Sequence, residues 1–279
     1  MSKKLPYEDG MKFETAADNY TALIKAFVKW LLIATLVGLI VGLVGVGFHH
    51  ALSFATEFRT ENRVIIFTMP VAGVLIVAIY KLLGMSNDPG TNCIIKGARG
   101  EEKVSLKLAP LIFVATFLTH FSGGSAGREG AALQLGGSIG YNTGRLLKLR
   151  KNDMHIIVMS GMSSVFAALF GTPLTAAIFS LEVTSVGTFH YAGLLPCVIS
   201  SVTAAQIAKK FALHPVQFQG IEFGSISWEL ALQVIFVAVI CAVVSILFCM
   251  TIKKSELLMD KLSEWLDNAN DYLQWFDME

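Results

Sequence analysis

Long uninterrupted runs of apolar residues dominate this sequence and limit what the chain can fold into. One run extends from about residue 22 to residue 55, and a second covers residues 64–83. A helix needs about 20 apolar residues to cross the hydrocarbon core of a bilayer. Hydrophobic residues make up 54% of the chain and charged residues only 15%, whereas a soluble domain carries about 25% charged residues. The chain is therefore predicted to be an all-α, multi-pass transmembrane protein.

The apolar segments between residues 108 and 183 are short. Four of them are too short for a full crossing, namely residues 108–121, 131–147, 156–170 and 174–183. Residues 191–208 and 228–250 are again long enough to span a bilayer. Helices that end at membrane depth are tolerated only around a protein-enclosed or water-filled cavity. Their positive N-terminal ends would point into that cavity, so these broken or half-crossing helices favour the binding of an anion.

Charge and cysteine patterns restrict the partners. Residues 1–21 are polar and are expected to form a cytosolic segment, because lysines gather before the first span and the positive-inside rule then places the N-terminus in the cytoplasm. The net charge of +1 provides no global field that would favour nucleic acid. The four cysteines and six histidines show no metal-ligand spacing. We expect a lipid bilayer as surroundings and neither a metal nor a cofactor.

The most informative motif is the glycine-rich stretch at residues 123–130, Gly-Gly-Ser-Ala-Gly-Arg-Glu-Gly. Its glycines leave backbone N–H groups accessible, and an apolar helix is expected to begin directly after them. Glu129 lies between apolar segments, where an ionised carboxylate is costly unless it has a function. Two other interpretations stay open. Arg128 and Glu129 could form a structural ion pair, or the loop could hold a phosphate, although the Gly-Lys-Ser/Thr ending of phosphate loops is missing.

A resemblance to the CLC family of chloride channels and proton-coupled halide antiporters rests on two stretches, GGSAGREGAALQLGGSIG and SGMSSVFAALFGTPLTAAIFSLEVTS. The first resembles the family's GREG signature and the second its paired short helices, and the likeness runs in order from about residue 30 to residue 260. It implies a CLC-type inverted-repeat fold. Residues 22–227 would form the first repeat, and residues 228–279 the first helix of a second repeat with an amphipathic tail. The fold is therefore expected to be truncated.

The resemblance also implies roles for individual residues. Glu129 matches the gating glutamate, whose carboxylate competes with the halide for the pathway and exchanges protons with the solution. A carboxyl buried among apolar helices holds its proton more readily than one in water, and we expect Glu129 to be buried in this way. The implied anion-binding residues are Thr91, Asn92, Gly127, Arg128, Glu129 and Gly130. Thr91 and Asn92 lie in the segment 88–93, where the family has its first selectivity loop.

Three departures from the family pattern resemble its fluoride-exporting branch. The selectivity loop lacks the usual serine, Ala131 replaces a proline, and Val183 stands where many antiporters have a glutamate. An amide donor such as Asn92 suits fluoride, which is a strong hydrogen-bond acceptor. Asn92 could instead cap the next short helix. The substrate is therefore expected to be chloride or fluoride, carried by a passive channel or by an antiporter that exchanges it for protons.

Three further expectations follow. The resemblance implies a homodimer, paired through helices within residues 174–208, in a bacterial plasma membrane. An alternative function is a non-transporting fragment, or a half-subunit that needs a partner. An intramembrane protease would need Ser125 or Ser160 close to a histidine, and no histidine has a convincing position in the sequence. We therefore do not expect an enzyme.

Overall fold

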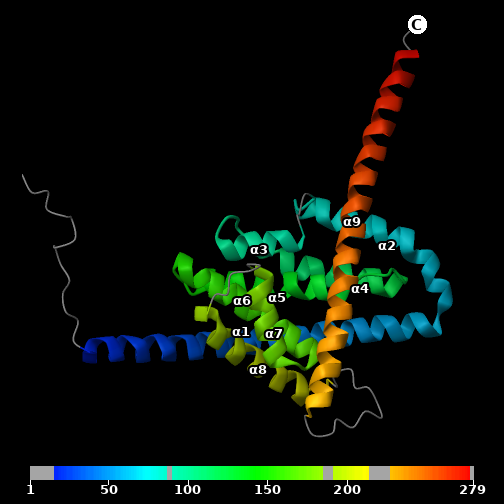
Figure 1. The fold of residues 1–279 in the computed structure, drawn as a ribbon. Coiled ribbons are helices and arrows are strands. Elements are labelled where there is room, and N and C mark those ends of the chain that lie inside the picture. Colours follow the sequence, from blue (N-terminus) through cyan, green and yellow to red (C-terminus); the bar gives the residue numbers. More distant parts are fainter. Residues whose placement is uncertain (1–15, 87–89, 185–190, 214–226, 277–279) are drawn as a thin grey trace, which may run out of the picture. The chain divides into compact units, whose positions relative to one another are not determined.

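A computed structural model of the chain describes residues 16–86, 90–184, 191–213 and 227–276. All regular elements within these ranges are helices (Figure 1), which confirms the predicted all-α class. The chain divides into two compact units, residues 1–217 and residues 218–279. The two units are described separately below. The predicted boundary at residues 227 and 228 between a first and a second repeat stays a prediction.

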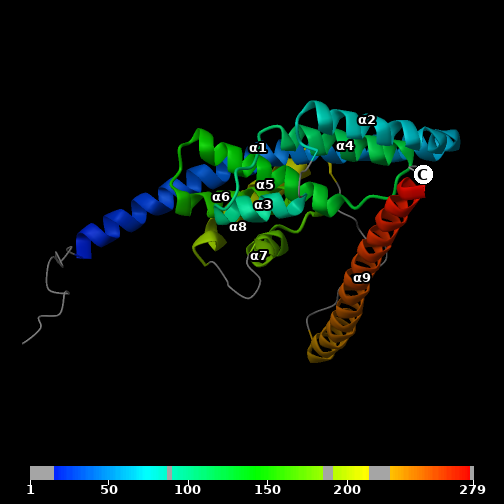
Figure 2. The same ribbon diagram turned by 90° about the horizontal axis from the view of Figure 1, so that it is seen from above.

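The first unit contains, in chain order, α1 (Ala16–Glu61), the 3-10 helix η1 (Arg63–Thr68), α2 (Met69–Leu82), α3 (Thr91–Arg99), α4 (Leu108–Ser122), α5 (Arg128–Leu146), α6 (Lys151–Phe170), α7 (Pro173–Thr184), the 3-10 helix η2 (Tyr191–Gly193) and α8 (Leu194–Lys210). The second unit contains α9 (Trp228–Phe276). Figure 2 shows α2 running alongside α4 in the first unit.

Five segments are long and apolar enough to cross a membrane: Leu23–Glu61, Arg63–Leu82, Asp153–Phe170, Tyr191–Lys210 and Trp228–Met259. The long spans expected from the sequence are all among them, and the chain is an integral membrane protein. The helices α4 and α7 are apolar but shorter than 18 residues, as the sequence predicts. Helices of that length cannot cross the bilayer unaided.

One sequence prediction of local structure was wrong. The segment 156–170 was expected to be a half-crossing helix, but α6 begins at Lys151 and its apolar part, Asp153–Phe170, reaches the length of a span. The polar segment 84–107, in which a short helix after Asn92 was one of the open interpretations, contains α3. This short helix is strongly amphipathic, with Cys93 and Ile94 buried, so its few apolar residues were hidden by polar neighbours in the sequence.

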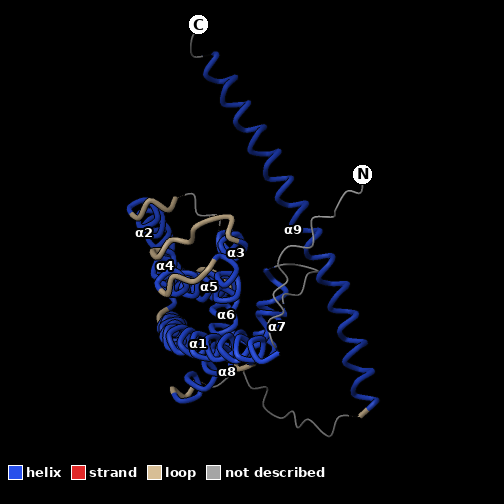
Figure 3. Tube along the Cα trace, turned by 90° about the vertical axis from the view of Figure 1, so that its left-hand side faces the viewer, coloured by secondary structure: helices blue, strands red, loops and turns tan. Residues whose placement is uncertain are grey.

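Small residues let the helices of the first unit approach one another closely. A methyl group added at Gly38 of α1 would lie 2.5 Å from the carbonyl oxygen of Ser200 of α8. The same holds where α5 crosses α6, because a methyl group on Gly161 would collide with the backbone of Gly136. Figure 3 shows α5 and α6 packed together with α1 and α8. Gly42 of the first span is packed against Ala204 in the same way, whereas Gly47 has nothing within 4 Å.

Polar side chains fasten helices that lie around α5. Lys29 of α1 forms a 2.6 Å salt bridge with Asp153, which is 6% exposed in the first turn of α6. Arg99 at the end of α3 donates two hydrogen bonds, of 3.2 and 3.1 Å, to the carbonyl oxygen of Thr184, the last residue of α7. These contacts hold α3 and α6 in place around α5.

Candidate anion site at two helix N-termini

The turn between α4 and α5 presents the start of α5. Helix α4 ends at Ser122, and Gly123 has a left-handed φ of 94°, which a side chain would disfavour. A methyl group on Gly123 would make an ordinary van der Waals contact, 3.4 Å, with Cδ of Arg59. Gly127 is the N-cap residue of α5, and no side chain caps it. The first backbone N–H groups of α5 therefore have no capping side chain as an acceptor, and the positive end of the helix dipole lies with them.

A second helix begins close by. The N-cap residue of α3 is Gly90, with φ of 66°, and again no side chain caps the helix. Thr91 and Asn92 form the first turn of α3, so they belong to a helix start and not to an irregular loop. The interpretation of Asn92 as the cap was wrong, because Gly90 holds that position. Residues 88 and 89 of the predicted selectivity segment lie outside the described residues.

The two helix starts meet through Thr91. Its Oγ1 atom lies 3.7 Å from the point that a methyl group on Gly130 would occupy. The side-chain amide of Gln134, also on α5, donates from Nε2 to Thr91 Oγ1 at 3.3 Å. The structure thus brings together Thr91, Gly130 and Gln134. Asn92 is exposed on the described surface of the first unit, and its part in anion binding stays a prediction.

Glu129 was expected to be buried, and that expectation was wrong for the described part of the chain. Its side chain is exposed, because the start of α5 lies at the edge of the first unit and not between its helices. The Oε2 atom lies 3.0 Å from the point that a methyl group on Gly127 would occupy, so the carboxylate folds back over the start of its own helix. A negative charge is favourable there. The predicted gating residue therefore lies at the same helix end as the predicted anion site.

The alternative of a structural ion pair is not supported. Among the described residues, Arg128 and Glu129 form no salt bridge with each other; the bridges found are Lys29–Asp153, Lys96–Glu102 and Arg150–Asp153. Arg128 is exposed at the first position of α5. Its side chain adds a positive charge to the helix start.

Gln134 was missed by the sequence analysis. It is 9% exposed, and its Oε1 atom is buried without a hydrogen-bond partner among the described residues. A signal existed in the sequence, because Gln134 is the one polar residue in the segment AALQLGG that follows the motif. Buried polar groups normally have partners, so a lone amide in an apolar helix points to a contact with another element.

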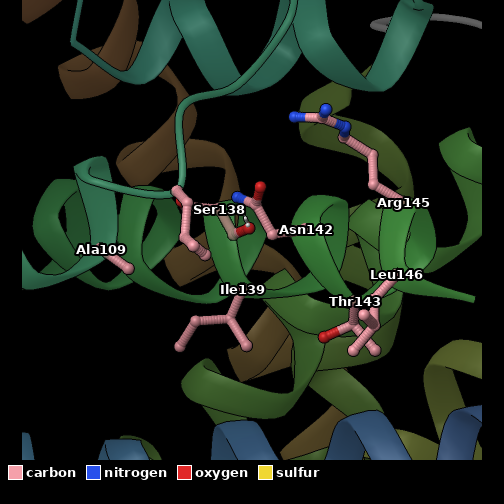
Figure 4. Close-up of a pocket in the computed structure, with 8 residues that line it drawn as sticks. Ala109, Ser138, Ile139, Asn142, Thr143, Arg145 and Leu146 are labelled. Atoms are coloured by element: carbon pink, nitrogen blue, oxygen red, sulfur yellow. Dashed lines mark hydrogen bonds between the residues drawn. The ribbon is translucent and has the colours of Figure 1, made fainter.

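A separate pocket of about 500 Å³ lies along the C-terminal half of α5. Figure 4 shows Ser138, Asn142 and Arg145 among its lining residues. Asn142 donates a 2.8 Å hydrogen bond to the carbonyl oxygen of Ser138. None of the six predicted anion-binding residues lines this pocket, so it is distinct from the helix starts described above.

The serines considered as protease nucleophiles have different surroundings. Ser160 is 1% exposed, and its hydroxyl donates to the carbonyl oxygen of Ile156, one turn earlier in α6, at 2.9 Å. Ser125 is exposed in the turn before α5. The hydroxyl of Ser160 thus takes part in helix packing, and no histidine contacts it among the described residues.

Comparisons with known proteins give a consistent result. A family model described as "Voltage gated chloride channel" matches residues 72–274. A "Chloride/fluoride channel protein" from Pseudomonas syringae pv. tomato is 36% identical over 192 residues, which is 68% of this chain and 42% of the relative. An "H(+)/Cl(-) exchange transporter ClcA" from Citrobacter koseri is 29% identical over 167 residues, covering 54% of this chain and 35% of the relative.

A solved structure extends the comparison to the fold. The crystal structure of a CLC-type fluoride/proton antiporter matches with a TM-score of 0.69 and 29% identity, over 81% of this chain and 55% of that one. The predicted CLC-type helical fold is confirmed. The chain spans about half or less of the length of the relatives that it matches.

Proposed function

This chain belongs to the family of voltage-gated chloride channels, and from that membership we propose that it carries a halide anion across the membrane along a pathway gated by Glu129. The observation that carries the proposal is the meeting of two uncapped helix starts, at Thr91 of α3 and Gly130 of α5. Backbone N–H groups and two helix dipoles there offer a favourable place for a small anion.

Glu129 is proposed as the gate because its carboxylate already lies over the start of α5, near Gly127. An ionised carboxylate competes with a halide for the same N–H groups. Once protonated, it loses the negative charge that the helix end favours, and the halide can take its place. Proton concentration would therefore control access to the pathway.

The proposed substrates are fluoride and chloride, with fluoride first. Two of the similar proteins are described by their names as acting on fluoride. Thr91 offers a hydroxyl at the meeting point, and Asn92 offers an amide in the same helical turn. Strong hydrogen-bond donors favour the small fluoride ion, which is the stronger acceptor. Exchange of the halide for protons is the second part of this proposal, since two of the similar proteins are named as proton exchangers.

Anion efflux from liposomes that contain the purified chain tests the proposal. Wild-type efflux of fluoride should exceed that of chloride and should rise as the external solution is acidified. Glu129→Gln imitates the protonated carboxyl, so its efflux should no longer depend on pH. A Glu129→Gln variant that keeps the full pH response would exclude the gating role. Liposomes that release neither ion would exclude transport by this chain alone.

A half-subunit that needs a partner is the second candidate. It is favoured by the coverage of only 42% of the Pseudomonas relative and 55% of the antiporter chain. Efflux measured at increasing protein-to-lipid ratios separates the two candidates. A first-order dependence on the protein indicates a self-sufficient chain, whereas a second-order dependence indicates that two chains combine to form the pathway.

A homodimer, a cytoplasmic N-terminus and a bacterial plasma membrane complete the proposal. The proposed contact of the homodimer is the face of α7 and α8 that carries exposed apolar residues, among them Leu174, Ile178 and Leu195; lipid could cover the same face in the monomer. The bacterial setting is supported by the source of the relatives named above. A Tyr20→Cys variant, labelled with a thiol reagent added to one side of the membrane or the other, would report the orientation of the N-terminus.

A further inference from the structure

Gln134 combines two features that the proposed pathway does not use. Its side chain is 9% exposed, and only one of the two polar atoms of its amide has a hydrogen-bond partner among the described residues. Nε2 donates to Thr91 Oγ1 at 3.3 Å, and Oε1 is buried without a partner in the part of the chain that the structure describes. Native proteins seldom leave a buried acceptor in this condition. An amide so placed at a helix start points to a missing ligand.

The hydrogen bond from Gln134 fixes what the Thr91 hydroxyl can do. A hydroxyl has one proton to donate and lone pairs that accept. Because Nε2 donates to Oγ1, the lone-pair side of Oγ1 is occupied and the proton stays available to another acceptor. The opposite arrangement, in which Thr91 donates to the amide oxygen, would remove that proton from any anion nearby.

The position of Gln134 agrees with a role at the helix starts. A methyl group added at Gly90, the N-cap of α3, would lie 3.7 Å from Nε2, and Thr91 Oγ1 lies close to Gly130 of α5. The amide therefore lies against the beginning of α3, at the point where α3 meets α5. Polarisation by the amide strengthens the hydroxyl as a donor, since hydrogen bonds in a chain reinforce one another.

We propose that Gln134 is a positioning residue of the anion pathway: its amide leaves the Thr91 proton free for the halide, and its Oε1 accepts a hydrogen bond from a water that enters with the ion. This inference rests on the proposed function of the same site. It favours fluoride over chloride, because fluoride is the stronger hydrogen-bond acceptor and brings tightly held water. Gln134 acts on the ion through Thr91 and through this water.

The first test compares Gln134→Met with Thr91→Val and with the double variant. Each single variant should lower the fluoride-to-chloride efflux ratio about tenfold, the usual effect of one hydrogen bond to a charged group. The double variant should lower the ratio by less than the two single effects combined, because Gln134 acts in part through the Thr91 hydroxyl. Ser138→Ala is the matched control, since it removes another buried polar group from α5, one bonded to the carbonyl oxygen of Ser105. Its ratio should equal that of the wild type.

The second variant, Gln134→Glu, keeps the shape of the side chain and changes its hydrogen bonding. Its ionised carboxylate can only accept hydrogen bonds. The Thr91 hydroxyl should therefore donate to the carboxylate and not to the halide, which lowers the fluoride preference at neutral pH. Protonation of the introduced carboxylate restores a hydrogen-bond donor. The fluoride-to-chloride efflux ratio of the variant should therefore return toward that of the wild type, measured at the same pH, as the pH is lowered. A change in packing alone would not recover with pH.

Three results would overturn the inference. Efflux ratios that match the wild type in both Gln134 variants would exclude the role while leaving halide transport intact. Additive losses in the double variant would show that Gln134 does not act through Thr91. Failure of both variants to fold, with a normal Ser138→Ala, would show a packing role.

Fluoride binding by the purified chain, followed by fluorine-19 NMR, gives the same comparison without flux. A wild-type chain that neither binds nor transports fluoride would remove the proposed function and this inference together.

Discussion

Two polar regions of the first unit differ in how completely their hydrogen bonds are made. Where α6 crosses α8, Ser163 and Ser200 are fully buried with 3.1 Å between their hydroxyl oxygens, and Ser200 also donates to the carbonyl oxygen of Ser160 at 3.0 Å. Where α3 meets α5, both helices begin at glycines that no side chain caps. Gln134 leaves Oε1 without a partner there, within the described residues.

The difference separates polar groups that hold helices together from polar groups that remain open to a ligand. The serine hydroxyls replace apolar packing between two helices, and their partners are all internal. The donors at the helix starts have the same chemistry but remain available. If this distinction is correct, substitutions in the two regions should affect different measurements, stability in the first and anion selectivity in the second.

The largest effect is expected from Gly161→Ala at the crossing of α5 and α6. The added methyl group would collide with the backbone of Gly136, which cannot move aside as a side chain can. We expect a loss of about 3 kcal/mol in the free energy of unfolding, the upper range for overpacking. Unfolding in sodium dodecyl sulfate, followed by circular dichroism, measures it. Gly47→Ala on α1 is the control and should stabilise the chain by about 1 kcal/mol or less, because nothing lies within 4 Å of it. Equal effects at the two positions would contradict the assignment of the crossing.

Thr91→Val should affect transport more than stability. It removes the hydroxyl at the meeting point of α3 and α5 and keeps the volume of the side chain. Loss of one donor to a charged ligand corresponds to about 1.5–3 kcal/mol, so fluoride efflux should fall by a factor of about ten or more. Thr203→Val on α8 serves as the control, because within the described residues its hydroxyl bonds only to the carbonyl oxygen of Ile199 in its own helix, at 2.8 Å. A similar loss of efflux in both variants would contradict the claim that the hydroxyl at the helix starts has a special role in transport.

Ser200→Ala should lower stability and leave ion selectivity unchanged, the reverse of the effect expected for Thr91→Val. The substitution removes a buried hydroxyl that bonds to α6 and leaves Ser163 with fewer partners. We expect stability to fall by about 1 kcal/mol, while the fluoride-to-chloride ratio of the folded protein stays at the wild-type value. Thermal unfolding in detergent and efflux from liposomes measure the two quantities. A changed ion preference would connect the serine cluster to the pathway.

The smallest effect belongs to the pair Lys96 and Glu102, which joins the end of α3 to the following turn. The hydrogen bond from Lys96 to Glu102, and then the charge of Glu102, raise the pKa of Lys96 above its ordinary value of 10.5. A raised lysine pKa adds stability that is complete below the ordinary value and is lost as the pH rises through the raised one. Both side chains are well exposed, 45% and 41%, so Glu102→Gln should lower the pKa of Lys96 in an NMR titration and leave unfolding near neutral pH almost unchanged.

The sequence predicted the spans well because their signal is strong and local. The expected break at Gly171-Thr172-Pro173 falls where α6 ends and α7 begins, and the expected end of the second span, at residue 83, lies one residue after Leu82. The start of α5 was likewise predicted from the glycines before it. Features that depend on contacts between distant segments were not predicted. The contact between Thr91 and Gln134 joins residues 43 positions apart, and no local pattern records such a pair.

The exposure of Glu129 was predicted incorrectly for a related reason. Apolar neighbours in the sequence suggested burial, but the carboxylate lies at the first turn of α5, where the helix reaches the edge of its unit. Residues further along the same helix are buried, from Ala131 to Ser138. Burial is set by the position of a residue along the packed helix, and sequence neighbours give only an average of it.

The contact between Gly136 and Gly161 has a mechanical consequence. At this crossing the backbones of α5 and α6 touch directly, without side chains that could yield between them. Helix α5 is roughly 28 Å long, and its stiffness carries this constraint from the crossing to its first turn. A slide or tilt of α5 would therefore have to disturb its packing against α6 at this crossing. For the gate proposed above, this rigidity favours the swing of the Glu129 side chain over the displacement of a helix.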